Sequence, residues 1–295
     1  MGAVGAVGYV IVVLGMLRRG DAIRADLDRV RADLGTAQGA VLDDRRRVER
    51  LSGGPAVLRR RDLDAGALGE LLEYWNPRLT TRLRPSEAML ILQRTRAVED
   101  LAVGRLATTA ADLLVRLLVA EAAPGERVEV CEIGTLFGLG ALLIHDHLVG
   151  RARSVSLTLV DPLSGYYGED RLDPNTGLVV SRRNLERNAR LLGVDAPDLR
   201  IVERLSTDPA ARAEVADRRY ELLVIDGDHS WDGIRRDHED YAGLVGPGGF
   251  LVIDDYSAPE WPDVTRYTDE VIARDRRFTA VGCWSHTAVF ARRSA

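Results

Sequence analysis

Residues 220–256 read YELLVIDGDHSWDGIRRDHEDYAGLVGPGGFLVIDDY, and this stretch decides the fold class. It holds two short apolar runs, residues 222–225 and 250–253, with a polar segment of helical character and a Gly-Pro-Gly-Gly turn between them. Short apolar strands that alternate with helices predict a parallel sheet buried on both faces. The sequence therefore predicts an α/β protein.

Both apolar runs end in acidic residues. Asp226, Asp228 and His229 follow the first run, and Asp254 and Asp255 follow the second. In open α/β sheets the ligand site lies beyond the carboxyl ends of the strands, so these side chains are expected at one edge. Carboxylates gathered there repel one another unless a cation or a proton intervenes. The first hypothesis is therefore a divalent metal site.

Composition excludes several classes of function. The chain has 295 residues, which suits one catalytic domain with extensions or two small domains. Its net charge is −5, whereas nucleic-acid-binding domains are typically basic, so no nucleic-acid partner is expected. Every basic residue is Arg, which excludes Lys as a general base or Schiff-base nucleophile. Cys131 and Cys283 are both expected in core strands, which indicates a reduced compartment and no disulfide framework.

The N-terminal segment predicts membrane attachment. Residues 2–17 form an unbroken apolar run of sixteen residues, followed at once by Arg18 and Arg19. This is slightly shorter than the roughly 17–25 residues of a spanning helix. Arg on the C-terminal flank favours a cytoplasmic C-terminus. Residues 1–19 are therefore interpreted as a membrane anchor at the cytoplasmic face. The alternatives are an apolar helix packed on a partner and a mis-set start codon.

Residues 20–52 are interpreted as a coiled coil. Two series of positions seven apart, offset by four, carry apolar residues with one exception, Asp44: Ile23, Val30, Ala37, Asp44 and Leu51, and Leu27, Leu34, Val41 and Val48. Such heptads predict a homo-oligomerising stalk. The alternative is one long helix that lies on the globular part of the same chain.

Residues 53–123 are helical in pattern and are interpreted as a helical cap. No residue in this region is a candidate for a catalytic or binding role. Trp75 in this region is expected to serve packing. Residues 124–295 form the predicted α/β domain. Further elements of it are expected at residues 154–160, 184–192, 200–202 and 277–293, the last as an antiparallel hairpin.

A glycine-rich turn follows the first predicted strand of this domain, residues 128–133. Gly134, Gly138 and Gly140 lead from that strand into a helix at residues 141–148. Such a turn lets a ligand approach the backbone closely, but alone it fits a dinucleotide, a nucleoside cofactor or a tight turn. Asp161 ends the next strand, 27 residues after Gly134. An acidic residue there can accept two hydrogen bonds from a ribose diol.

The chemistry of the acidic cluster separates two cofactor types. A nicotinamide dehydrogenase is expected to carry GxGxxG, whereas this chain has GTLFGLG at residues 134–140. Hydride transfer needs no carboxylate-bound metal. Methyl transfer to a hydroxyl can use one, because the metal lowers the pKa of the hydroxyl and holds it near the methyl carbon. Oxygen ligands suit Mg²⁺.

Four segments carry a family resemblance. They are EIGTLFG (residues 132–138), IDGDHS (225–230), GPGG (246–249) and IDDY (253–256). In order and spacing they resemble class I S-adenosylmethionine-dependent methyltransferases, in particular the metal-dependent O-methyltransferases of the macrocin and aminocoumarin-sugar type. The resemblance covers residues 124–293. It implies a Rossmann-like, seven-stranded, mostly parallel sheet with a C-terminal antiparallel hairpin.

The resemblance also implies roles for individual residues. The cofactor S-adenosylmethionine would contact Glu132, Gly134, Thr135, Gly138, Asp161, Ser206 and Asp226. Mg²⁺ would be bound by Asp226, Asp254 and Asp255, with Asp228 as general base and His229 as a base or substrate contact. Asp254 and Asp255 could instead cap a turn, and Asp228 could close an Asx-turn.

One position departs from the family pattern. Relatives commonly show Gly-Asp-Ser before the adenine site, and this chain has Arg204-Leu205-Ser206. The acidic residue that would contact the adenine in relatives is therefore missing here. Asp208 lies nearby in sequence, but no other observation assigns it that contact.

The predicted function is S-adenosylmethionine-dependent O-methylation of a hydroxyl on a sugar or natural-product-like small molecule. Three alternatives stay open. Two are enzymes on the same fold, a metal-independent methyltransferase and a relative of the cephalosporin hydroxylase group. The third is a non-catalytic, membrane-tethered coiled-coil scaffold.

Overall fold

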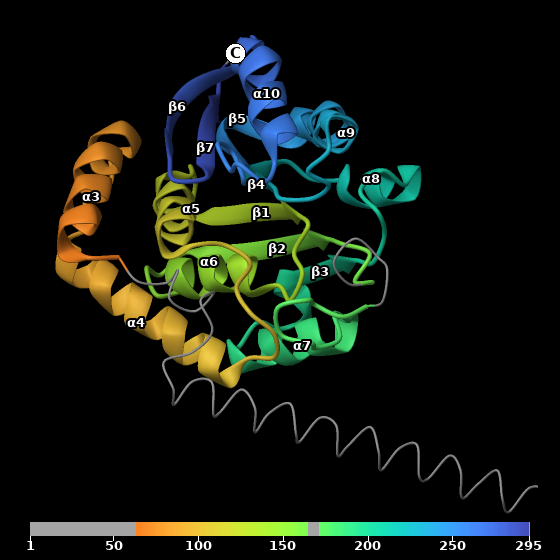
Figure 1. Cartoon of the computed structure of the whole chain (residues 1–295), viewed down its shortest axis with the longest axis horizontal. Helices are drawn as coiled ribbons and strands as arrows, with labels where there is room; N and C mark the ends of the chain where they lie inside the picture. Colours follow the sequence, from red (N-terminus) through yellow and green to blue (C-terminus); the bar gives the residue numbers. More distant parts are fainter. Residues whose placement is uncertain (1–62, 165–170, 295) are drawn as a thin grey trace, which may run out of the picture. The chain divides into compact units, whose positions relative to one another are not determined.

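A seven-stranded sheet lies at the centre of the computed structural model, which describes residues 63–164 and 171–294 (Figure 1). The strands are β1 (Arg127–Ile133), β2 (Ser154–Val160), β3 (Leu199–Val202), β4 (Tyr220–Ile225), β5 (Val245–Ile253), β6 (Phe278–Trp284) and β7 (Thr287–Arg292). Their order is β3-β2-β1-β4-β5-β7-β6. The pairs among β1 to β5 are parallel, and β7 runs antiparallel to both of its neighbours, β5 and β6. The predicted mostly parallel sheet with an antiparallel hairpin is confirmed.

Helices cover both faces of the sheet (Figure 1). They are α3 (Ala65–Leu79), α4 (Pro85–Leu101), α5 (Ala110–Ala122), α6 (Leu139–Val149), α7 (Arg182–Leu191), α8 (Pro209–Val215), α9 (Trp231–Tyr241) and α10 (Pro262–Glu270), with 3-10 turns η2 (Ala196–Asp198), η3 (Ala242–Leu244) and η4 (Ile272–Arg274). Neighbouring strand residues point to opposite faces. Leu222 and Val224 therefore pack in one core with α5, α6 and α7, whereas Leu223 and Ile225 pack in a second core with α8, α9 and α10.

The predicted elements of the α/β domain are found close to their expected positions, with one difference. β5 begins at Val245, so the Gly-Pro-Gly-Gly segment lies inside this strand and not in a turn before it. The pairing of β4 with β5 shifts register between Tyr220 and Leu222, which accommodates the glycines as an irregularity of the strand.

The helices before β1 belong to the same body as the sheet. The described residues form one compact unit. α5 is buried from Ala110 to Ala120 and packs against β4 and α6, so it is part of the layer that covers the sheet. Trp75 is fully buried, which confirms its expected role in packing. Cys131 is buried in β1, but Cys283 in β6 is exposed, so its expected place in the core is wrong.

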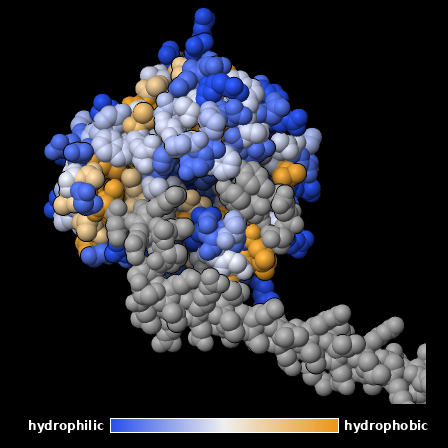
Figure 2. All heavy atoms as spheres, in the orientation of Figure 1, coloured by the Kyte–Doolittle hydropathy of each residue, from blue (hydrophilic) through white to orange (hydrophobic). Residues whose placement is uncertain are grey.

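The predicted membrane anchor at residues 1–19 and the coiled coil at residues 20–52 lie outside the described residues. Within the described ranges, no helix is both long enough and apolar enough to cross a membrane. Figure 2 shows a mostly hydrophilic surface on the face in view, with apolar residues in small separate patches.

Candidate active site

The acidic residues predicted at the strand ends meet at one edge of the sheet. Each continues the backbone ladder by one residue beyond its strand, which fixes its Cα position. The bonds run from Asp161 N to Val202 O (3.1 Å), from Asp226 N to Ile133 O (2.8 Å) and from Asp254 N to Ile225 O (3.0 Å). The carboxyl ends of β2, β4 and β5 therefore each present a carboxylate beside the turn that follows β1.

The turn after β1 requires glycine where it meets the end of β4. Gly134 has φ +76°, a left-handed conformation that favours glycine. A Cβ at Gly134 would overlap the backbone carbonyl of Asp226. Gly138 has φ +78° and forms the N-cap of α6 without a side-chain cap, so no side chain covers the amino end of that helix. The glycine-rich turn and the acidic edge are therefore in direct contact.

Asp161 shapes this turn. Its Oδ2 accepts hydrogen bonds from the amides of Thr135 (2.7 Å) and Leu136 (2.9 Å), and its Oδ1 accepts one from Leu163 N (2.7 Å). Burial raises the pKa of Asp161, and these three amides oppose the shift. A carboxylate oxygen that already accepts a backbone amide keeps a further lone pair, so Asp161 can still accept a hydrogen bond from a ribose hydroxyl. The ribose contact itself stays a prediction.

Glu132 and Thr135 form a buried pair at the root of the turn. Thr135 Oγ1 donates to Glu132 Oε2 at 2.6 Å. Burial raises the pKa of Glu132 to about 7, against the opposing effects of Arg116 and Thr135. Glu132 is thus held in place from two sides.

Arg116 of α5 lies among these acidic residues, and sequence reasoning did not assign it. Its side chain is 2% exposed. Nη1 lies 3.2 Å from Glu132 Oε1, while Nη2 lies 3.0 Å from Asp226 Oδ2 and 2.5 Å from Asp254 Oδ2. Burial opposes the charge on Arg116, but the three carboxylates outweigh it and raise its pKa. A permanent cation therefore already lies inside the predicted metal cluster.

Asp254 and Asp255 are adjacent in sequence but have different partners. Asp254 contacts Arg116 and, through Oδ1, the Thr287 hydroxyl at 3.4 Å. Asp255 has φ +57° and contacts His229 Nε2 through Oδ2 at 2.8 Å. A left-handed residue at this point turns the chain between the two carboxylates, and such conformations cluster at functional sites.

His229 is a second cation at the edge. Its Nε2 lies 2.8 Å from Asp255 Oδ2 and 3.7 Å from Asp226 Oδ1. Its ring stacks on Trp261 with centroids 4.4 Å apart and an interplanar angle of 19°. Burial lowers the pKa of His229, but Asp226 and Asp255 outweigh burial and raise it to about 10. The same contacts, with Arg116, lower the pKa of Asp226 despite its burial.

The group best arranged to hold a metal ion differs from the predicted set. Single ligand atoms of Asp226, His229 and Asp255 all lie within 4.8 Å of one another. Asp254, predicted as the third ligand, is instead turned to Arg116. Burial raises the pKa of Asp254, and the Arg116 guanidinium opposes that shift. Two of the three predicted ligands thus share a potential metal site, and His229 joins them.

The remaining predicted residues lie around this centre. Asp228 is exposed, and its Oδ1 accepts a bond from Ser230 N (2.9 Å) that closes the turn into α9. The backbone oxygen of Ser206 accepts a bond from Tyr241 Oη (2.7 Å). Asp208 caps α8 through Ala210 N (2.9 Å), which gives it a structural role.

Asp112 is a further residue that the sequence analysis missed. It lies one turn before Arg116 on α5 and is 1% exposed. Its Oδ1 accepts bonds from His286 N (2.9 Å) and Thr287 Oγ1 (3.0 Å), so it ties the β6–β7 turn to α5. The signal was present in the run AADLLVRLLVAEA, because a charge buried in an apolar helix requires a partner.

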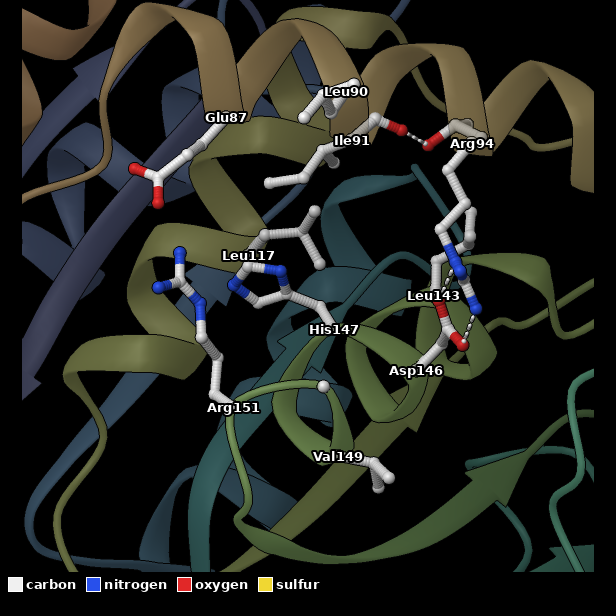
Figure 3. Close-up of a pocket in the computed structure, with 12 residues that line it drawn as sticks. Glu87, Leu90, Ile91, Arg94, Leu117, Leu143, Asp146, His147, Val149 and Arg151 are labelled. Atoms are coloured by element: carbon white, nitrogen blue, oxygen red, sulfur yellow. Dashed lines mark hydrogen bonds and ion pairs between the residues drawn. The ribbon is translucent and has the colours of Figure 1, made fainter.

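A cavity of about 420 Å³ lies elsewhere, between α4 and the last turn of α6 (Figure 3). Its lining includes Leu90, Ile91 and Val149, and Arg94 and Asp146 form a bidentate pair at its edge (2.6 Å for both bonds). α6 begins at the site edge and ends at the opposite edge of the sheet, so this cavity contains none of the predicted site residues.

Comparisons with known proteins agree with this geometry. A family described as "Methyltransferase domain" matches residues 131–256. The O-methyltransferase NovP is similar in structure, with a TM-score of 0.52 and 16% identity over 78% of this chain and 100% of that chain. A looser likeness, TM-score 0.39 and 16% identity over 56% of this chain and 44% of the other, is to the methyltransferase MycE in complex with Mg, SAH and mycinamycin VI.

An uncharacterized protein of Acanthamoeba polyphaga mimivirus is 24% identical over 163 residues, which are 52% of this chain and 66% of the viral protein. The chain thus spans just under two thirds of that relative's length. The fold is that of the class I, Rossmann-like methyltransferases. Residues 131–256 match a family model described as a methyltransferase domain, and the fold agrees with that match.

Proposed function

We propose that this enzyme transfers the methyl group of S-adenosylmethionine to a hydroxyl of a sugar or natural-product-like small molecule. The observation that carries the proposal is the contact between Gly134 of the glycine-rich turn after β1, here called the cofactor turn, and Asp226 of the acidic edge. A methyl donor on the turn would lie beside the carboxylates that orient the acceptor. NovP, whose fold this chain shares, is an O-methyltransferase.

The cofactor would be held by the residues of the turn and its surroundings. Glu132 and Gly134 would contact its methionine end, Asp161 its ribose and Ser206 its adenine. The open amino end of α6 at Gly138 favours the carboxylate of the methionine part. Each of these groups is anchored by backbone or side-chain bonds before a ligand arrives, which lowers the cost of ordering on binding.

The donor set at the edge fits a divalent cation. Asp226, His229 and Asp255 would hold it, since their ligand atoms already lie within 4.8 Å of one another. Such an ion would lower the pKa of the acceptor hydroxyl and fix its oxygen near the methyl carbon. We propose Mg²⁺ or a similar hard cation. The two carboxylates also suit Mn²⁺.

The proton of the acceptor hydroxyl would pass to Asp228. This carboxylate is exposed at the same edge, whereas His229 has a pKa raised to about 10 by its two carboxylates and is protonated at neutral pH. A protonated imidazole cannot accept a proton, and an imidazole whose Nε2 has lost its proton to bind the ion has no lone pair free at that atom, so we assign His229 to the cation site and to orientation. Trp261, stacked on His229, offers a flat surface to the acceptor.

The test is calorimetric titration of S-adenosylmethionine into the full chain, with and without Mg²⁺, followed by a screen of hydroxyl acceptors with methyl-labelled cofactor. Micromolar binding and label transfer to oxygen would support the proposal. Absence of binding in both conditions would refute it and favour the scaffold alternative. Asp161→Asn is expected to weaken cofactor binding. Exposed Asp217→Asn, whose carboxylate pairs with Arg200 away from the turn, serves as the control.

Membrane attachment through residues 1–19, oligomerisation through residues 20–52 and a location at the cytoplasmic face of the membrane remain proposals. They rest on the apolar run and the heptads alone. Deletion of residues 1–19 is expected to move the protein from the membrane fraction to the supernatant, and deletion of residues 20–52 to reduce its mass in solution. Unchanged fractionation or mass would contradict them.

A further inference from the structure

We propose that Arg116 is a positioning residue that acts as the fixed cation of the acidic site. Its guanidinium neutralises Asp254 and Glu132, and it thereby keeps Asp254 out of the group that binds an exchangeable divalent ion. That group consists of Asp226, His229 and Asp255. The inference rests on the proposed function in one respect only, that a divalent ion binds at this edge.

The first support is the burial of Arg116. It lies in the apolar helix α5 with 2% of its side chain exposed. A buried guanidinium is strongly unfavourable unless carboxylates surround it. Three carboxylates do so, those of Glu132, Asp226 and Asp254. The buried positive charge of Arg116 is therefore stabilised by these three carboxylates, and their negative charges are stabilised by Arg116.

The second support is the position of one nitrogen atom. Arg116 Nη2 lies 3.0 Å from Asp226 Oδ2 and 2.5 Å from Asp254 Oδ2. A cation between the ends of β4 and β5 is thus supplied by the chain itself. Because the guanidinium is planar and always charged, it holds these two carboxylates at a fixed separation at any ordinary pH.

The third support is the space left for the pair. A Cβ at Gly140 would lie 2.9 Å from Glu132 Oε1 and 3.3 Å from Arg116 Nη1. Because residue 140 is glycine, the first turn of α6 leaves room for the ion pair between Glu132 and Arg116. The glycine after Gly138 in the cofactor turn accommodates Arg116, a role that the glycine pattern alone did not suggest.

The fourth support is the second partner of Asp254. Its Oδ1 lies 3.4 Å from the Thr287 hydroxyl, which in turn lies 3.0 Å from Asp112 Oδ1. Asp254 is therefore held between α5 and β7. The next residue, Asp255, turns away through its left-handed backbone and contacts His229. The two neighbouring carboxylates thus belong to separate halves of the site.

The experiment is titration of the full chain with Mn²⁺, followed by calorimetry and by the electron paramagnetic resonance signal of free Mn²⁺. In the wild-type background, Asp255→Asn is expected to weaken Mn²⁺ binding, whereas Asp254→Asn leaves it nearly unchanged. Arg116→Met is expected to tighten binding by at least about tenfold, because a unit positive charge a few ångströms away is removed. The double variant Arg116→Met/Asp254→Asn is expected to lose that gain.

Two controls separate charge from packing. Arg116→Lys keeps the charge but not the planar guanidinium, and it is expected to show no tenfold gain in Mn²⁺ affinity. Arg105→Met removes another arginine of a buried pair, whose Nη2 lies 3.0 Å from Asp173 Oδ1, and is expected to leave Mn²⁺ binding unchanged. A merely structural role of Arg116 would lower stability without a gain in Mn²⁺ affinity that depends on Asp254.

The proposal is overturned if Asp254→Asn abolishes Mn²⁺ binding in the wild-type background, or if Arg116→Met leaves the affinity unchanged. Should Arg116→Met fail to fold, the comparison of Asp254→Asn with Asp255→Asn decides. Should the wild type bind no Mn²⁺, the gain in Arg116→Met decides. Titration of the same proteins with S-adenosylmethionine tests the proposed function separately, because cofactor binding can fail while the Mn²⁺ pattern holds.

Discussion

Arg116 Nη2 lies 2.5 Å from Asp254 Oδ2, and this contact joins a helix that precedes the first strand to the end of the fifth. The two residues are 138 positions apart in sequence, since 254 − 116 = 138. The helix α5 thus contributes directly to the site, although residues 53–123 were expected to carry no chemistry.

Replacement of Arg116 by Met is expected to lower the free energy of unfolding by about 3–5 kcal/mol, because it leaves buried carboxylates without their cation. Denaturation in urea measures the change. The matched control is Arg235→Met on α9, whose Nη1 lies 2.7 Å from Glu239 Oε2 at the surface, and loss of this solvent-screened pair is expected to change stability much less. Equal losses in the two variants would contradict the central place of Arg116.

Gly134→Ala is expected to destabilise the protein by about 3 kcal/mol or more and to abolish cofactor binding, because its Cβ would overlap the carbonyl of Asp226 at a positive φ. Gly69→Ala is the control. A Cβ at Gly69 meets nothing within 4 Å, and the residue lies inside α3, so alanine should stabilise the helix by up to about 1 kcal/mol. Thermal unfolding and calorimetry of both variants test this, and an intact cofactor site in Gly134→Ala would refute it.

Asp237 gives a stability change with pH. It is 1% exposed, and burial raises its pKa from 3.8 to about 7, with further contributions from Asp228 and Asp240. A raised carboxyl pKa means that the folded state favours the protonated form. Stability from this group is therefore complete below pH 3.8 and is lost as the pH rises to about 7.

Asp237→Asn removes this pH dependence. The stability of the variant relative to the wild type is expected to rise by about 4 kcal/mol between pH 4 and pH 7, from roughly three pKa units at 1.36 kcal/mol each. Urea denaturation at a series of pH values measures the difference. A constant difference across that range would show that Asp237 is ionised in the folded protein at every pH tested.

Binding of a divalent ion is expected to release about one proton per ion near neutral pH. His229 has a pKa of about 10 because of Asp226 and Asp255, so its imidazole must lose a proton before it can act as a ligand. Calorimetry in two buffers of different ionisation enthalpy measures the release. His229→Gln is expected to abolish it, and a wild-type heat that does not depend on the buffer would contradict the assignment.

The order of strands and helices could be predicted from the sequence because both signals are local. The continuous apolar run at residues 222–225 and the acidic residues after it required no knowledge of distant contacts. The gathering of Asp226, Asp254 and Asp255 at one edge followed from the rule that parallel strands end together.

The partners of these carboxylates could not be predicted in the same way. Whether Asp254 meets a metal or an arginine depends on how α5 packs against the sheet, over a long separation in sequence. The left-handed backbone of Asp255 is not visible in an Asp-Asp pair, yet it decides which carboxylate contacts His229. The buried charges of α5 were the one signal that could have directed attention to Arg116 and Asp112.

The β6–β7 hairpin has a consequence for the time at which the site is completed during synthesis. β7 lies between β5 and β6, and Thr287 Oγ1 bonds to Asp112, which is 175 positions earlier. A nascent chain that has emerged from the ribosome only as far as Asp255 already carries its glycine turn and the acidic residues of the site. Asp112 and Asp254 would still lack Thr287. Translation of this hairpin is therefore the step after which a growing chain can first assemble the whole catalytic edge.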